Sequence, residues 1–496
     1  MSNPTTALDS AACYQALLSR DARFDGQFFT AVKTTGIYCR PVCKVRAPLA
    51  KNCLFFASAA RAEAAGFRPC LRCRPELAPA AVPRWSTQDA SQILAAQATQ
   101  LLDSAESLTD APLRVSDLAA RLGVSARHLR RILAQHLGVS PLQYRQTRRL
   151  LLAKQLLCDT ALPIVHVAQL SGFASQRRFN AAFADHYHLT PSACRRDGQV
   201  GNELRLMLAY RPPYAEAATL RFFGQRAVPG LEHVEADEDG SDAFARVLRV
   251  AVGERSHLGW LRVQFEAAAH RLHLQLSDSL LPVLPAVLQR VRWALDLDAD
   301  PLAIEGALAS DFAHCAGWRV PGAWDGFEMA VRAVLGQQVT VAAARTLTQR
   351  LLQAFGDPLA TPWPQLTHAF PTPERLLRAS ADELGQLGIV RQRQMAIQAL
   401  ANAVLHAGLD LNPGPPLQTT LQALLALPGI GEWTAQYIAM RALRWPDAFP
   451  AGDIVVQQRL GVRNRPQPER AATAMAAAWQ PWRSYAVIRL WHGGPP

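Results

Sequence analysis

The sequence predicts a multidomain α+β protein with four parts in order: a small four-cysteine α/β domain, an all-helical double helix-turn-helix, a mixed α/β subdomain, and a helical domain with a helix-hairpin-helix. Three observations predict this order. Two close cysteine pairs lie near the start, a helix-turn-helix pattern then occurs twice, and an LPGIG turn lies in the helical remainder. A chain of 496 residues also exceeds the length that one hydrophobic core serves.

Two segments with the composition of linkers divide the chain. They are the Pro/Ala stretch 77–86 and the polar stretch 197–202. After the second linker, alternating strands such as RLHLQL are mixed with helical patterns, and helical patterns dominate from residue 291 onward. We therefore expect domains at 1–78, 85–197, 203–290 and 291–496.

Positive charge is concentrated in the first two-fifths of the chain. Residues 1–200 carry 25 Lys and Arg against 13 Asp and Glu, whereas residues 201–496 carry 27 of each. This excess is typical of a surface that contacts nucleic-acid phosphates, although a merely solvated basic face gives the same count. No apolar run approaches the roughly 18 residues that span a bilayer, and no signal peptide is apparent, so we expect a cytoplasmic protein without a membrane partner.

Four of the nine cysteines form two close pairs. Three residues separate Cys39 from Cys43, two separate Cys70 from Cys73, and 26 residues lie between the pairs. Two thiolate pairs on separate turns suit a tetrahedral site, so the spacing predicts one Zn²⁺. The spacing alone leaves open whether that ion only holds the fold. The other cysteines are expected to be ordinary buried thiols: Cys13, Cys53, Cys158, Cys194 and Cys315.

Residues 28–76 read FFTAVKTTGIYCRPVCKVRAPLAKNCLFFASAARAEAAGFRPCLRCRPE and resemble the N-terminal domain of the Ada alkylation-response family. The resemblance implies that zinc is structural and thiolate-activating, and that Cys39 irreversibly accepts a methyl group from a methylated DNA phosphate. Conversion of that thiolate to a thioether removes a negative charge and would strengthen DNA binding. Arg46 and Arg68 resemble the family's phosphate contacts, with solvated surface arginines as the alternative.

Two similar segments follow the cysteine domain at an offset of 49 residues: LAARLGVSARHLRRIL (118–133) and VAQLSGFASQRRFNAAF (167–183). Each reads as a helix, a turn at glycine and a second helix, with Ser125 and Ser175 as the N-caps of the second helices. One such pattern fits a generic helical bundle equally well. Two copies joined by a long helix at about 141–158 resemble the AraC family of regulators. The residues expected to contact DNA are Arg127, Arg130, Gln176, Arg177 and Arg178.

The AraC resemblance adds expectations about partners. It implies promoter DNA as the ligand, RNA polymerase as a further partner, and a location at the nucleoid. A monomer is the expected oligomeric state.

The LPGIG segment at 427–431 predicts a helix-hairpin-helix turn, in which the backbone N–H groups of Gly429 and Gly431 approach a DNA phosphate. A simple helix-ending turn is the alternative. Asp453 follows 22 residues after Gly431 at the expected start of a helix, where an aspartate is often only an N-cap. The chain from 203 onward nevertheless resembles the AlkA family of 3-methyladenine DNA glycosylases, in RPPY, VRAVLGQQVTVAAA, LPGIGEWTAQYIAMRAL and WQPWRSYAVIRLW.

The AlkA resemblance implies a hydrolase in which Asp453 stabilises the oxocarbenium charge of the sugar. Bifunctional relatives place a lysine where Trp433 lies, and no lysine follows Lys154, so we expect base removal without strand cleavage. The cysteine quartet that would hold an iron–sulfur cluster is also absent after the hairpin. Trp433, Tyr437 and Trp491 match the family's base pocket, although core packing is the alternative for each. Gln338 lies where the family places an apolar wedge, which leaves that role open here.

Together the two resemblances predict a DNA-3-methyladenine glycosylase II fused to a methyl-sensing transcriptional activator, acting on double-stranded alkylated and promoter DNA. The competing hypothesis is a regulator whose C-terminal domain only binds damaged DNA.

Overall fold

The structure is a computed structural model that describes residues 8–80, 90–103, 114–195, 204–236, 242–253, 255–414 and 416–492. The chain divides into two compact units. The first comprises Met1–Pro212, Glu266–Gln289 and Leu297–Ala299, and the second comprises Pro213–Phe265, Arg290–Asp296 and Asp300–Pro496. Most of the expected linker at 77–86 and all of that at 197–202 lie outside the described residues. Within the described ranges, no helix combines the length and apolar character that crossing a bilayer requires.

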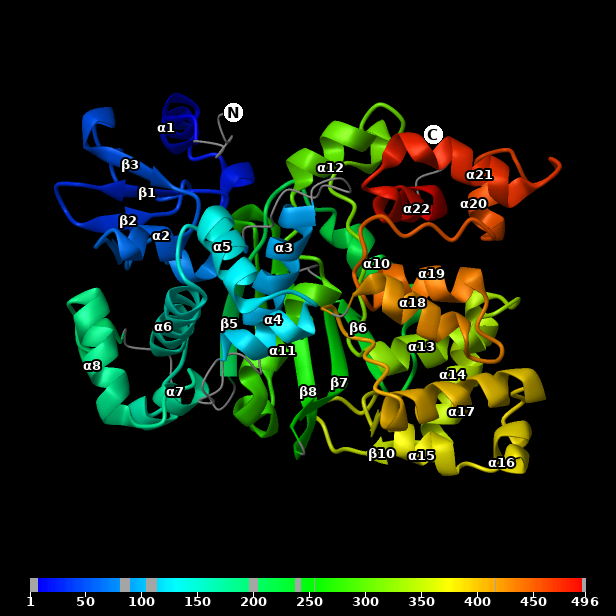
Figure 1. The fold of residues 1–496 in the computed structure, drawn as a ribbon. Coiled ribbons are helices and arrows are strands. Elements are labelled where there is room, and N and C mark those ends of the chain that lie inside the picture. The colour runs from blue at the N-terminus through cyan, green and yellow to red at the C-terminus, as the bar shows by residue number, and fades with distance from the viewer. Residues whose placement is uncertain are drawn as a thin grey trace. The chain divides into compact units, whose positions relative to one another are not determined.

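The four-cysteine domain contains a small sheet with strand order β3–β1–β2–β4 (Figure 1). Strand β1 pairs antiparallel with both β2 and β3, and β2 pairs in parallel with β4. The parallel register places Tyr38 opposite Pro69, and the backbone N–H of Cys70 donates to the Tyr38 carbonyl at 2.9 Å. Cys39 and Cys70 are therefore brought together by the sheet. The strands are β1 (Phe29–Val32), β2 (Ile37–Cys39), β3 (Cys53–Phe56) and β4 (Arg68–Pro69).

Two helices complete this domain, α1 (Ser10–Ser19) and α2 (Ala59–Ala64). Ser58 caps α2, because its side chain accepts a hydrogen bond from the Arg61 backbone. Ala59 and Ala62 of α2 pack on Phe29 and Tyr38 of the sheet in one buried cluster. The hydrophobic core of the domain lies between this helix and the sheet.

The helix-turn-helix pair is present at both expected places. Ser125 accepts a hydrogen bond from the His128 backbone at 3.2 Å, and Ser175 accepts one from the Arg178 backbone at 3.3 Å, which confirms both N-caps. Ser140 and Gln143 form a capping box at the start of the long joining helix. The helices are α3 (Ala90–Asp103), α4 (Val115–Arg121), α5 (Ala126–Leu137), α6 (Pro141–Asp159), α7 (Ile164–Leu170), α8 (Gln176–Tyr187) and α9 (Pro191–Cys194).

The first unit also contains the antiparallel pair β5 (Leu204–Ala209) and β9 (Arg271–Leu276). In the second unit, β7 (Asp242–Val252) pairs antiparallel with β6 (Glu232–Ala236) on one side and with β8 (Arg255–Glu266) on the other. The predicted mixture of strands and helices at the start of the C-terminal half is therefore confirmed.

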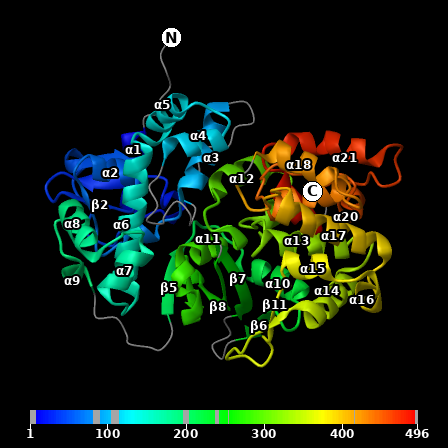
Figure 2. The ribbon, with the colours of Figure 1, turned by 60° about the horizontal axis from the view of Figure 1, so that its bottom comes forward.

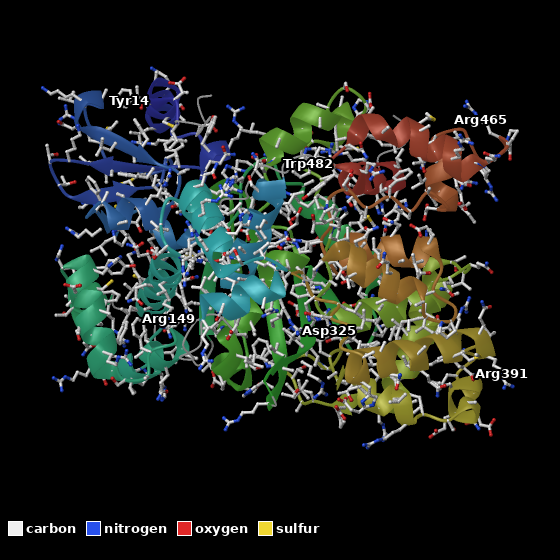
Figure 3. All side chains as sticks on the ribbon, viewed as in Figure 1. Tyr14, Arg149, Asp325, Arg391, Arg465 and Trp482 are labelled. Atoms are coloured by element: carbon white, nitrogen blue, oxygen red, sulfur yellow. The ribbon has the colours of Figure 1, made fainter. Side chains whose placement is uncertain are left out.

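Helices dominate the second unit, as expected. They pack around α13, which contacts α17 and α19 and is buried along most of its length (Figure 2). Asp325, labelled in Figure 3, caps α13 by accepting a hydrogen bond from the Glu328 backbone at 2.9 Å. The helices are α10 (Glu216–Arg226), α12 (Pro301–Leu308), α13 (Gly326–Leu335), α14 (Val341–Phe355), α15 (Pro373–Arg378), α16 (Ala381–Gln386), α17 (Arg391–His406), α18 (Leu417–Leu425), α19 (Glu432–Arg441), α20 (Ile454–Arg459), α21 (Pro468–Ala476) and α22 (Arg483–His492).

Candidate functional site

A cleft of about 1160 Å³ opens in the second unit. Its walls come from α10, α13, α14, α19, α20 and the end of α22, together with the turn before α19. Seven residues that the sequence predicts to act in catalysis, base binding or phosphate binding line this cleft: Gln338, Gly429, Gly431, Trp433, Tyr437, Asp453 and Trp491. A cleft of this volume accommodates a nucleotide base.

The turn between α18 and α19 has the geometry of a helix-hairpin-helix. Gly429 adopts φ +78°, a conformation that favours glycine, and a Cβ there would lie 3.0 Å from the Cβ of Ala396 in α17. The backbone conformation and the close packing therefore each require glycine at this position. Gly431 is the N-cap of α19 and is exposed, which leaves the backbone N–H groups at the helix start open to an anion. Gln337 fixes the turn, because its Nε2 donates to the Gly429 carbonyl at 2.8 Å and to Thr434 Oγ1 at 2.9 Å.

Asp453 lies at the start of α20 and accepts three hydrogen bonds. Its Oδ1 accepts from the Val456 backbone at 2.9 Å and from Trp491 Nε1 at 3.2 Å. Its Oδ2 accepts from Trp433 Nε1 at 3.0 Å. Asp453 is therefore an N-cap, and its carboxylate also faces the cleft between two indoles.

The three expected pocket aromatics form one slot. The rings of Trp433 and Tyr437 are stacked with centres 5.3 Å apart and planes 19° apart, and the centres of Tyr437 and Trp491 are 6.0 Å apart. All three side chains are half-buried and line the cleft, rather than lying in the fully buried core. An electron-rich slot of this kind attracts flat, electron-poor rings.

Gln338 lies at the rim of the cleft. It is exposed and adopts φ +54°, a left-handed conformation that is uncommon for a residue other than glycine. Val339 and Val341 beside it are exposed apolar side chains that also line the cleft. The rim therefore presents both a polar and an apolar candidate for filling the gap left by a flipped base.

Several residues of the cleft carry no local sequence signal. Arg226 and Arg441 line it, and the ring of Phe222 lies beneath both guanidinium groups, at 3.8 and 4.8 Å from their carbons. Burial lowers the pKa of Arg441 and lowers that of Arg226 to about 10. Burial and the neighbouring Arg226 charge also lower the pKa of His492 to about 4, so this histidine is neutral. These residues come together only through tertiary packing, so the sequence does not predict them as part of the cleft. The role of Gln337 in the turn was not predicted for the same reason.

The four paired cysteines meet in the first unit. Their sulfur atoms all lie within 4.8 Å of one another, and Cys39, Cys43 and Cys70 are buried while Cys73 is partly exposed. Hydrogen bonds from the other three thiols lower the pKa of Cys70, and a hydrogen bond from Cys39 lowers that of Cys43 to about 7. Hydrogen bonds within the same cluster raise the pKa of Cys39 and that of Cys73. Four clustered sulfurs are the donor set that a structural zinc ion prefers.

The residue after the first cysteine anchors this cluster. Arg40 donates from its backbone to Cys73 Sγ at 3.3 Å and from Nη1 to the Cys73 carbonyl at 3.1 Å. Its guanidinium also pairs with the buried carboxylate of Asp25. The two predicted phosphate contacts differ, because Arg46 is exposed and Arg68 is half-buried.

The predicted DNA-reading side chains lie on the accessible faces of their helices. All five are exposed: Arg127, Arg130, Gln176, Arg177 and Arg178. Phe179 and Phe183 of α8 are fully buried, and their ring centres are 5.5 Å apart. Arg149, labelled in Figure 3, lies 5.2 Å from the ring centre of the neighbouring Phe173. The aromatic residues of this helix therefore serve the core, whereas its basic residues are exposed.

Comparison with known protein families accounts for most of the chain. Residues 12–76 match the metal binding domain of Ada, and residues 118–197 match a helix-turn-helix domain. Residues 205–325 match the AlkA N-terminal domain, and residues 331–483 match the HhH-GPD superfamily of base excision DNA repair proteins.

One relative matches almost from end to end. It is the probable bifunctional transcriptional activator/DNA repair enzyme AlkA of Mycobacterium tuberculosis, 39% identical over 497 residues that cover 97% of this chain and 96% of that protein. The chain belongs to this family. Two relatives match single parts of the bifunctional chain. DNA-3-methyladenine glycosylase 2 of Escherichia coli is 37% identical over 58% of this chain and 96% of its own length. The bifunctional activator Ada of the same organism is 38% identical over 29% of this chain and 37% of its own length.

Proposed function

We propose that this protein removes alkylated bases such as 3-methyladenine from double-stranded DNA by hydrolysis, and that it also senses methylated DNA phosphates and activates transcription. The observation that carries the first activity is Asp453 held between Trp433 and Trp491 in a cleft beside a helix-hairpin-helix turn. The proposed domains are 1–78, 85–197, 203–290 and 291–496.

The proposed reaction breaks the bond between C1′ of the deoxyribose and the base nitrogen. The electron pair leaves with the base, and the sugar develops positive charge that the Asp453 carboxylate stabilises. A water oxygen then bonds to C1′ and gives its proton to Asp453 or to solvent. Trp433, Tyr437 and Trp491 hold the flipped base, and the N–H groups at Gly429 and Gly431 hold a phosphate. No lysine follows Lys154, so the sugar is not attacked by an amine and the strand is not cleaved.

We further propose one zinc ion at Cys39, Cys43, Cys70 and Cys73, and no iron–sulfur cluster. Bound zinc would keep the sulfurs deprotonated and anchor the fold of the domain. The Cys39 sulfur attacks the methyl carbon of a phosphotriester, so that an S–C bond forms, the C–O bond breaks and the phosphodiester leaves as an anion. Arg46 and Arg68 hold flanking phosphates.

The helices α5 and α8 are proposed to enter the major groove through Arg127, Arg130, Gln176, Arg177 and Arg178. As an activator, the protein would act as a monomer at the nucleoid and contact RNA polymerase.

Replacing Asp453 by Asn tests the excision reaction, because an amide cannot stabilise the sugar cation or take the proton. We expect release of free 3-methyladenine from methylated duplex DNA to fall by about a hundredfold or more. The measurement is chromatographic detection of the free base under single-turnover conditions, with binding to the same duplex measured alongside. If neither the wild type nor the variant released base while both bound, the C-terminal half would only bind damaged DNA.

A further inference from the structure

Five arginines line the cleft, and the three on α10, α13 and α19 differ in their partners. Arg332 forms ion pairs with Glu232 and Glu328, each at 3.0 Å. Arg226 and Arg441 form no ion pair with any residue that the structure describes. Among the described residues, neither guanidinium has a carboxylate at ion-pairing distance, although the charge of Glu232 raises the pKa of Arg441 while no carboxylate does so for Arg226.

Arg441 uses its donors within the protein. Its Nη1 donates to the Tyr437 hydroxyl at 2.9 Å, its Nη2 donates to the Gly322 carbonyl at 3.3 Å, and its Nε donates to the Pro321 carbonyl. This side chain therefore holds Tyr437 in the slot.

Arg226 is different. The only hydrogen bond that its guanidinium makes to a described residue runs from Nη1 to the Phe222 carbonyl, with a length of 3.4 Å. Its guanidinium carbon lies 3.8 Å from the centre of the Phe222 ring, which fixes the plane of the group. None of its nitrogens is among the buried, unpartnered atoms of the described residues, so its other N–H groups keep some exposure, and the residue lines the cleft.

A cation in this position costs free energy until a ligand supplies an acceptor. Burial lowers the pKa of Arg226 to about 10, and the charges of Arg441 and Arg332 add to the effect, yet the group stays protonated at neutral pH. A ligand that brings oxygen or nitrogen lone pairs, or negative charge, would offset that cost. A cationic ligand would increase it.

We propose that Arg226 contributes to base specificity by donating hydrogen bonds to an acceptor edge of the flipped base, so that it extends excision to bases that are uncharged before bond cleavage. The proposal rests on the excision activity proposed above. It assigns the aromatic slot and Arg226 opposite preferences, because the slot attracts cationic bases and the guanidinium repels them.

The chemistry of bond cleavage explains the preference. A purine methylated at N3 or N7 is already cationic, so the electron pair of the broken C1′–N bond makes it a neutral leaving molecule. An uncharged base such as hypoxanthine leaves as an anion and then takes a proton from water. A guanidinium hydrogen-bonded to the base stabilises that developing negative charge in a site shielded from water.

The test compares single-turnover release of hypoxanthine and of 7-methylguanine from matched duplexes by the full-length protein. We expect Arg226→Gln to slow hypoxanthine release about tenfold or more, because a hydrogen bond from a charged donor is lost, and to leave 7-methylguanine release unchanged or faster. Arg226→Lys, which keeps the charge, should restore part of the hypoxanthine rate. The matched control is Arg221→Gln, since Arg221 is exposed on the same helix α10 outside the cleft, and it should leave the ratio of the two rates unchanged.

Equal loss of both activities in Arg226→Gln, or no change in either, would overturn the proposal, because the ratio of rates reports specificity whereas a folding defect lowers both. If the wild type released neither base, the proposed excision activity would fail and this inference with it. If the wild type released only 7-methylguanine and Arg226→Gln did so equally well, excision would stand and the role of Arg226 would fall.

Discussion

At the scale of single residues, the Asp453 carboxylate accepts one backbone hydrogen bond and two indole hydrogen bonds. The backbone bond at Val456 is an ordinary N-cap and fixes the side-chain rotamer. The indole bonds come from Trp433 and Trp491, whose rings also form the walls of the base slot. The same tryptophans therefore hold the carboxylate and form the slot, so in the proposed reaction the position of the sugar and that of the base are linked.

Replacing Trp433 by Phe separates these tasks, because it removes the Nε1 donor and keeps a ring against Tyr437. A hydrogen bond to a charged group contributes about 1.5–3 kcal/mol, so we expect base release to slow by about tenfold or more. The measurement is the single-turnover rate of 3-methyladenine release by protein shown to be folded by its thermal melting. The matched control is Trp479→Phe, because Trp479 also donates to a carboxylate, that of Asp311 at 2.7 Å, outside the cleft. An equal loss in both variants would contradict the assignment.

At the scale of elements, the short helix α2 holds the cysteine domain to both helix-turn-helix motifs. Glu63 on α2 is buried and accepts hydrogen bonds from Tyr38 at 2.8 Å and from Thr147 of α6 at 2.5 Å, and it pairs with His186 of α8 at 2.7 Å. Gly138 ends α5 with φ +71° directly against Arg61, and a Cβ at Gly138 would overlap that guanidinium. The C-terminal ends of both DNA-reading helices therefore rest on one turn of α2.

The pair of His186 and Glu63 predicts a pH dependence of stability. Burial alone would lower the pKa of His186, but the hydrogen bond and charge of Glu63, with the charge of Asp185, raise it above 6.5. The folded state then binds the proton more tightly than the unfolded state, so this stabilisation is present below the unfolded pKa and is lost as pH rises through the folded pKa.

We expect His186→Gln to lower the free energy of unfolding by about 1 kcal/mol at about pH 6 and by less at about pH 8.5. Denaturant titration of the full-length protein at both values measures it. His166→Gln is the control, because His166 is exposed on α7. A loss of equal size at both pH values would show that the charge of His186 does not contribute.

At the scale of the whole molecule, the sequence predicted those features that local spacing encodes. The two N-caps at Ser125 and Ser175, the glycine turn at 427–431 and the cluster of four cysteines all follow from residues close together in the chain or from pairs of fixed spacing. Arg226 could not be predicted in this way, because it reaches the cleft only when α10 packs beside helices that lie far along the chain. Glu63 was missed for the same reason, since its partners lie in separate elements.

The cysteine cluster and the cleft belong to different compact units of the chain. Each site also takes its residues from its own unit: the four cysteines lie within 39–73, and the slot and Asp453 lie within 433–491. We therefore expect two chemistries in one chain, a single-use methyl acceptor and a repeated hydrolysis, with separate requirements for metal.

The most direct test uses methylated duplex DNA and two samples of the full-length protein. One sample is loaded with zinc, and the other has been treated with a chelator that competes with the cysteine thiolates for the metal. Mass spectrometry of the Cys39 peptide and the yield of free 3-methyladenine are measured in the same samples. The account predicts one added methyl group on Cys39 and many bases released per protein, with the chelator abolishing the first and leaving the second. Loss of both on chelation, or base release without any methyl group on Cys39 in the zinc-loaded protein, would contradict it.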